Sequence, residues 1–177
     1  FTEVVIDADL EAHMARVVDG ARDLLAPVAE ELARAGARKF DPITWMLALD
    51  EDRAVPTDGE LADATLSLPG ILLAQLATIA SAGKQGLDTA AVPPIAVVGH
   101  SQGVLATEAL ARSDQDRDAD DAQLLALARL IGAAAALTAR RRGLAGTAEA
   151  SPMLSVSQVV PQDVEVLLAQ YVGELPA

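Results

Sequence analysis

The stretch GHSQG at residues 99–103 holds the residue types that acyl-group chemistry requires. It follows a short apolar run, residues 95–98, and leads directly into a helix-like stretch. A glycine on each side of the serine permits a sharp turn that lifts the hydroxyl clear of the backbone. At a helix N-terminus, the N–H group of Gln102 can stabilise an oxyanion forming beside Ser101. The pattern predicts a serine nucleophile, and the alternative is a serine that only caps the helix.

A serine hydroxyl needs a base at neutral pH, and the chain offers two histidines. His100 is the immediate neighbour of Ser101, and adjacent side chains on such a turn point in different directions. His13 falls within a predicted helix, on its polar side, and is interpreted as a solvated surface histidine. No histidine follows Ser101. We therefore expect either that the protein is no hydrolase or that the base lies outside this chain.

The elements that would position the serine alternate between helix and strand patterns. Apolar residues spaced near 3.6 predict helices, and short apolar runs predict buried strands. The predicted helices cover residues 8–36, 42–49, 69–82, 102–111, 123–142 and a last stretch from 161 toward 171, and the predicted strands cover 95–98 and 153–159. This order predicts an α/β fold with a helix-covered parallel sheet, and two strands are too few to complete that sheet.

Composition and net charge limit the fold classes and the partners to be considered. Apolar residues make up 51% of the 177 residues and aromatic residues 2%, which favours closely packed helices and helix-covered sheets. A net charge of −13 argues against a nucleic-acid partner. The basic cluster Arg140-Arg141-Arg142 is interpreted as complementing the dipole at a helix end.

The cellular setting is also constrained by what the sequence contains. The chain has no cysteine, so it has no disulfide or thiolate metal site, as fits a reducing cytoplasm. No uninterrupted apolar run reaches the roughly 20 residues of a membrane span. The acidic first residues lack the basic start of a signal peptide. Because Phe1 is not a start methionine, we interpret the chain as a segment of a longer polypeptide.

Three stretches carry a resemblance to a known family. They are LSLPGILLAQLATIA (66–80), PPIAVVGHSQGVLATEAL (93–110) and LALARLIGAAAALTARRRG (125–143). They resemble the malonyl/acetyl-CoA:acyl-carrier-protein acyltransferases, and more narrowly the acetyltransferase domain of bacterial (actinobacterial, mycobacterial) type I fatty acid synthase. SPMLSVSQV (151–159) resembles the start of that family's small ferredoxin-like subdomain.

The resemblance implies roles for the residues of the motif. Ser101 matches the serine that forms the acyl-enzyme ester, and Gln102 matches the residue whose backbone N–H forms half of the oxyanion hole. Gly99, His100 and Gly103 complete the motif, and this histidine is not the family's base. That base is a histidine downstream of the small subdomain, and the second oxyanion donor comes from an upstream GQG loop.

The resemblance also implies the domain plan and the partners. Residues 1–150 would be a partial acyltransferase core of the α/β-hydrolase-like type, and residues 151–177 the beginning of the ferredoxin-like subdomain. The substrates would be acetyl-CoA and the phosphopantetheine thiol of an acyl carrier protein, with no cofactor held by this segment. Other synthase domains would be neighbours in a homo-oligomeric, cytoplasmic multienzyme, without nucleic acid or membrane.

The prediction about which acyl group is transferred depends on Ile131. Malonyl-transferring members of the family have an arginine just before a glycine on the helix after the serine, and this chain has Ile131 before Gly132. Helical geometry places Arg129 on the side opposite Leu127 and Ile131. An apolar residue in that position would leave a malonyl carboxylate unpaired, so acetyl is favoured over malonyl. Periodicity alone leaves open that Ile131 is only a core residue.

Two other functions stay open. A thioesterase or esterase fragment of the α/β-hydrolase type would carry an HGGG-like loop and a downstream Asp and His pair, which this chain lacks. A catalytically inactive segment that acts as a scaffold in a multienzyme is the other alternative.

Overall fold

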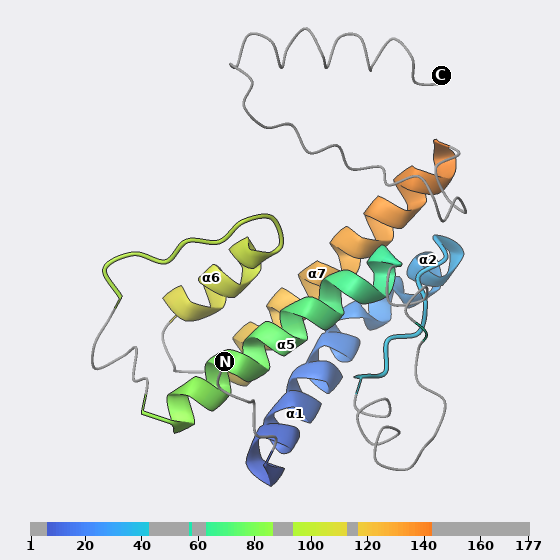
Figure 1. Cartoon of the computed structure of the whole chain (residues 1–177). Coiled ribbons are helices and arrows are strands. Elements are labelled where there is room, and N and C mark those ends of the chain that lie inside the picture. The colour runs from blue at the N-terminus through green and yellow to red at the C-terminus, as the bar shows by residue number, and fades with distance from the viewer. Residues whose placement is uncertain (1–6, 43–56, 58–62, 87–93, 113–116, 143–177) are drawn as a thin grey trace, which may run out of the picture.

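The part of the chain that the computed structural model describes is built from helices (Figure 1). It comprises residues 7–42, 57, 63–86, 94–112 and 117–142. The helices are α1 (Ala8–Leu25), a 3-10 turn at Ala26–Val28, α2 (Ala29–Arg34), α5 (Ala64–Lys84), α6 (Gly103–Ala111) and α7 (Arg117–Arg141). Helix α7 packs along both α1 and α5, and the shorter α6 lies against α5 and α7.

The first predicted helix, residues 8–36, is divided in the structure. Its start is fixed by Asp7, whose side chain accepts a hydrogen bond of 2.8 Å from the Leu10 N–H. Pro27 has no N–H to continue the helical ladder, so α1 ends at Leu25 and a 3-10 turn leads into α2. The chain leaves α2 through Gly36 at φ +77, as predicted for a glycine at a helix end.

Arg140 stabilises this helix end from a distant part of the chain. Its guanidinium donates to the carbonyl oxygens of Ala35 at 2.7 Å and Gly36 at 2.9 Å. These carbonyls have no helical partner, and a cation beside them also complements the helix dipole. The prediction that the arginine cluster complements a helix dipole is confirmed for Arg140 and Arg141, which lie in the last turn of α7. Arg140 in addition serves the end of α2.

Helix α5 begins five residues before the predicted start at Pro69. The Asp63 carboxylate accepts hydrogen bonds from the backbone N–H of Thr65 at 2.8 Å and from its hydroxyl at 2.7 Å, and this caps the helix. Pro69 therefore lies inside the helix, and the carbonyl of Thr65 loses the N–H donor that would lie four residues on. Arg129 of α7 donates to that carbonyl at 2.6 Å and replaces the missing bond.

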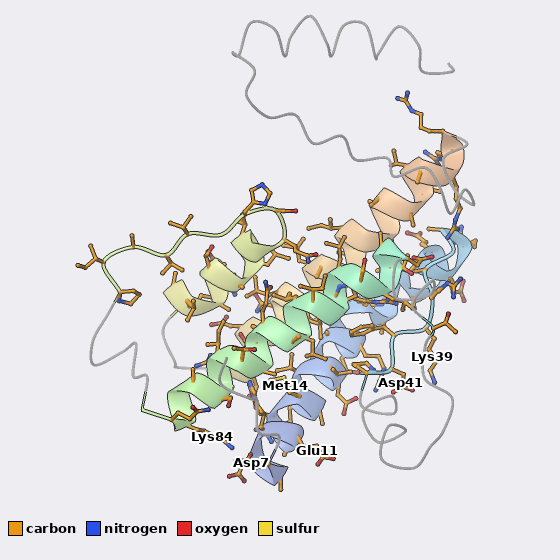
Figure 2. The ribbon with its side chains drawn as sticks, viewed as in Figure 1. Asp7, Glu11, Met14, Lys39, Asp41 and Lys84 are labelled. Atoms are coloured by element: carbon orange, nitrogen blue, oxygen red, sulfur yellow. The ribbon has the colours of Figure 1, made fainter. Side chains whose placement is uncertain are left out.

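The ion pair of Asp7 with Lys84 joins the start of α1 to the end of α5. Figure 2 shows the two side chains next to each other, and their Nζ–Oδ1 distance is 2.5 Å. The Lys84 ammonium, together with the Leu10 N–H, lowers the pKa of Asp7. Both groups are largely exposed, so the pair orients the two helix ends more than it stabilises them.

The core is formed by the facing sides of α1, α5 and α7. Its leucine, valine, methionine and alanine side chains are those of Leu10, Met14, Val17, Val18, Ala21, Leu72, Leu73, Leu76, Leu124, Leu125, Ala126 and Ala128, with Ala109 of α6. Small residues let the helices approach closely: a side chain at Gly132 would collide with the carbonyl of Ala64, and one at Gly20 would lie 3.0 Å from the Ala122 Cβ. This packing agrees with the near absence of aromatic residues.

The strand predicted over residues 95–98 is wrong for the described part of the chain. Ile95 is a bend and residues 96–98 have no regular secondary structure, and no strand occurs elsewhere in the described segments. Ile95 and Val98 are fully or almost fully exposed, at 106% and 92%. A strand requires a neighbouring backbone with which to exchange hydrogen bonds, and no described segment supplies one. The described part is thus all-helical rather than α/β.

Other predictions fall outside the described residues. These are the helix over 42–49 beyond its first residue, the strand over 153–159, the helix from 161 and the domain boundary at 150. The helix predicted over 123–142 is confirmed as α7, which starts earlier, at Arg117. Asp118 and Asp120 lie in its first turn, where acidic side chains complement the helix dipole.

Helices α5 and α7 are each long and apolar enough to cross a membrane by length and composition. The sequence prediction considered only uninterrupted apolar runs and did not detect this. About a third of each apolar window is buried within the fold, 33% for α5 and 39% for α7, and core helices of soluble proteins meet the same criterion. Length and composition alone are therefore weak evidence that α5 or α7 crosses a membrane.

Candidate active site at the GHSQG turn

Ser101 has an unusual backbone conformation. Its φ is 56°, and among the described residues it is the one non-glycine residue with a positive φ. Left-handed conformations cost a side-chain-bearing residue about 1–3 kcal/mol and gather at functional sites. The side chain is exposed, and helix α6 begins two residues later at Gly103. A serine on a tight turn that opens a helix is the geometry of a nucleophile elbow.

The backbone of the turn leaves a donor available beside the serine. The N–H of Gly103 donates to the His100 carbonyl at 2.9 Å, and the N–H of Val104 donates to the Ser101 carbonyl at 3.2 Å. Within the described segments, no acceptor is bonded to the N–H of Gln102 or to the Ser101 hydroxyl. An N–H left free at the start of a helix is suited to binding an oxyanion.

The two glycines of the motif have different environments. A Cβ on Gly99 would collide with the backbone carbonyl of Gly103 and with the Thr107 methyl group, so a side chain there is excluded. A Cβ on Gly103 would meet nothing within 4 Å. Among the residues that the structure describes, crowding therefore requires a glycine at position 99 but not at position 103.

Neither histidine is bonded to Ser101. His100 is exposed, and its imidazole makes no hydrogen bond within the described segments. His13 is not the solvated surface residue that its position on the helix predicted, because its side chain is only 13% exposed. Its Nδ1 lies 2.5 Å from Oδ1 of Asp118, and its Nε2 lies 3.5 Å from Oδ2 of Asp121.

His13 and its acidic partners form a charged cluster between α1 and α7. Asp121 and Asp118 raise the pKa of His13, while burial opposes them. Burial also acts on Asp118, but Arg16 and His13 outweigh it and hold the pKa of this carboxyl below its usual value. Asp118 and Asp121 are three residues apart and share a helix face. The spacing of these two aspartates could be read from the sequence. No residue pattern indicated that α1, which carries His13, packs against them.

Ile131 and Arg129 lie on different sides of α7, as predicted. Ile131 is 43% exposed, as is its neighbour Leu127 at 44%, so neither is a core residue. Arg129 extends toward α5 and donates to the carbonyls of Thr65 and, at 2.9 Å, Arg38. Its guanidinium also lies 5.4 Å from the centroid of the Phe40 ring. Arg129 is thus held away from the face that carries Ile131.

A strained, exposed serine at a helix N-terminus is the arrangement of a nucleophile elbow, which serine acyltransferases share with serine hydrolases. The chain belongs to the starter unit:ACP transacylase family. The family model described as "Starter unit:ACP transacylase in aflatoxin biosynthesis" matches residues 7–176, which is nearly the whole chain. No curated protein matches it.

Membership of this family agrees with the acyltransferase resemblance of the sequence. Such domains transfer a starter acyl group onto an acyl carrier protein within a multienzyme synthase. The match runs across the predicted boundary at residue 150 and therefore includes both predicted subdomains.

Proposed function

We propose that Ser101 is the residue on which this domain carries its acyl group. The Ser101 oxygen attacks the carbonyl carbon of an acyl-CoA thioester, the C–S bond breaks, and CoA leaves as the thiol. The hydroxyl proton passes to a general base and then to the departing sulfur. The phosphopantetheine thiol of the carrier protein takes the acyl group in the reverse sequence, which restores the serine. The left-handed backbone of Ser101 is the observation that carries this proposal.

The N–H of Gln102 is proposed as one donor to the tetrahedral oxyanion. Its freedom from intramolecular acceptors within the described segments supports that role. The base and the second donor are proposed to come from outside the described residues. His13 is paired with the carboxylates of Asp118 and Asp121, and the His100 side chain makes no bond to the serine.

Acetyl is the proposed starter group, and the setting proposed is a homo-oligomeric, cytoplasmic type I fatty acid synthase of the bacterial kind. Support for acetyl comes from α7, where the family resemblance matches Ile131 with the malonyl-binding arginine. Arg129, the nearest arginine on the helix, is occupied by two carbonyls on a different side. The complete domain is proposed to have the α/β acyltransferase fold.

Mass spectrometry of the full-length polypeptide tests the proposal. After incubation with acetyl-CoA, the peptide that contains Ser101 should gain one acetyl group, and hydroxylamine should remove it because the linkage is an ester. Ser101→Ala should show no gain at this peptide. Addition of carrier protein should transfer the label to its phosphopantetheine thiol rather than release acetate.

Three results would contradict this proposal. Unmodified Ser101 with both acetyl-CoA and malonyl-CoA would favour an inactive scaffold. Release of acetate in place of transfer would favour a thioesterase. Faster loading of malonyl than of acetyl would leave Ser101 as the nucleophile but refute the argument from Ile131.

A further inference from the structure

A small pocket lies between α1, α2 and α7, with a volume of about 170 Å³. No residue of α6 or of the GHSQG turn lines it. Most of its lining residues are apolar, namely Val18, Ala21, Leu25, Ala29, Leu32, Phe40 and Leu125. Two arginines, Arg22 and Arg129, also line it.

Arg129 is a cation without a counter-ion among the residues that the structure describes. Its partners there are the carbonyls of Thr65 and Arg38 and the ring of Phe40. The two carbonyls engage two of the five N–H groups of a guanidinium, which leaves donors for a further acceptor. The chain has 26 acidic and 13 basic residues, yet no carboxylate of the described part pairs with this arginine.

An unpaired cation in such a place is energetically unfavourable. Burial lowers the pKa of the Arg129 guanidinium, which shows that its surroundings disfavour the charge. Carbonyl dipoles and an aromatic ring offset this cost in part. Arg129 is partly buried, and charges withdrawn from water in proteins are ordinarily paired, so a bound anion would supply the missing partner.

We infer that this pocket is a binding site for a small monocarboxylic acid with an apolar body, and that its carboxylate pairs with Arg129. The planar guanidinium fork matches a carboxylate. Seven apolar side chains suit a hydrocarbon body better than a phosphate or a sugar. An apolar cavity of about 150 Å³ holds benzene, so the volume here sets the limit near one aromatic ring.

Arg22 would assist at the mouth of the pocket. Its side chain is 61% exposed and its NH1 lies 2.5 Å from Oδ1 of Asp19, so its charge is partly neutralised. It can strengthen the positive potential that an anion meets on entry, but Arg129 is the deeper group and sets the specificity. The site goes beyond the acyl transfer proposed for Ser101.

Benzoate is the probe that fits these requirements. Titration of the full-length polypeptide, followed by calorimetry and ligand-observed NMR, should give a dissociation constant of about 1 mM or below. Benzamide has the same shape without the charge, and acetate has the charge without the ring. Both should bind at least about tenfold more weakly than benzoate.

Two exposed alanines of α2 provide a matched pair of variants. Ala29 lines the pocket and Ala33 does not. Ala29→Phe should therefore abolish benzoate binding, whereas Ala33→Phe should leave it unchanged. Loading of Ser101 with acetyl-CoA should be the same in both variants, since neither alanine lies at the GHSQG turn.

The proposal is wrong if benzoate does not bind at about 10 mM, or if benzamide binds as tightly as benzoate. It is also wrong if Ala29→Phe and Ala33→Phe bind benzoate equally well, because binding would then be located elsewhere. Arg129→Lys gives an additional measurement: it keeps the charge but loses the fork, so binding should weaken without disappearing.

Discussion

Arg129 donates a hydrogen bond of 2.6 Å to the carbonyl of Thr65, the oxygen that Pro69 leaves without a helical donor. A proline inside a helix ordinarily weakens it, because the carbonyl four residues earlier is orphaned. Here a side chain of α7 supplies the missing donor to α5. The bond therefore makes the stability of one helix depend on the position of the other.

This relationship predicts a coupling that a double-mutant cycle can measure. Arg129→Met should lower the free energy of unfolding by about 2 kcal/mol, because charged hydrogen bonds to two carbonyls are lost. In a Pro69→Ala background, the new N–H at position 69 can donate to Thr65. The same arginine substitution should then cost about 1 kcal/mol less in urea unfolding. Equal costs in both backgrounds would contradict the interpretation.

The His13 cluster predicts a pH-dependent stability. The pKa of His13 is raised in the folded protein, so its charged form stabilises the fold. This contribution is fully present below the unfolded pKa of about 6.5 and is lost as pH rises through the folded pKa. His13→Gln should therefore cost about 2 kcal/mol at acidic pH near 6 and less above the folded pKa.

His100→Gln is the control for that measurement. His100 is exposed and its imidazole makes no hydrogen bond in the described segments, so its substitution should change the free energy of unfolding little at either pH. Urea unfolding monitored by circular dichroism between pH 6 and 9 provides both comparisons. A cost of His13→Gln that does not vary with pH would show that the histidine acts by packing alone.

Substitution of the two glycines of the GHSQG motif by alanine should have opposite effects on the free energy of unfolding. Gly99→Ala places a methyl group against the Gly103 carbonyl and should destabilise the turn by about 1–3 kcal/mol. Gly103→Ala meets open space and lies at the start of α6, where alanine favours the helix by up to about 1 kcal/mol. Thermal unfolding of both variants gives the comparison, and similar losses of stability would refute it.

Ile131→Arg should change the choice of acyl group. An arginine there can pair with a malonyl carboxylate, so loading of malonyl relative to acetyl should rise by at least about tenfold. Leu130→Arg is the matched control, because Leu130 is similarly exposed, at 41%, but faces another direction. Competition between the two CoA thioesters, measured by mass spectrometry of Ser101, reports the ratio. An equal effect of both arginines would indicate a general effect of charge.

The local parts of the structure could be predicted from the sequence. Apolar periodicity identified α5 and α7, and the glycine spacing identified the turn at Ser101. These features depend on residues close together in the chain. The helix boundaries were less accurate: the prediction missed the Asp63 cap and the break at Pro27, which are set by single hydrogen bonds.

The chain by itself determined where the helices lie, which serine sits on the strained turn and that the core is built from leucine, valine and alanine. Only the tertiary structure decided which residues meet. It paired His13 with Asp118 across 105 positions, and it directed Arg129 to a carbonyl 64 positions away. It also left residues 95–98 without a strand partner in the described part. Helical hydrogen bonds close within four residues, whereas side-chain pairing between helices and the pairing of strands depend on packing that no local pattern encodes.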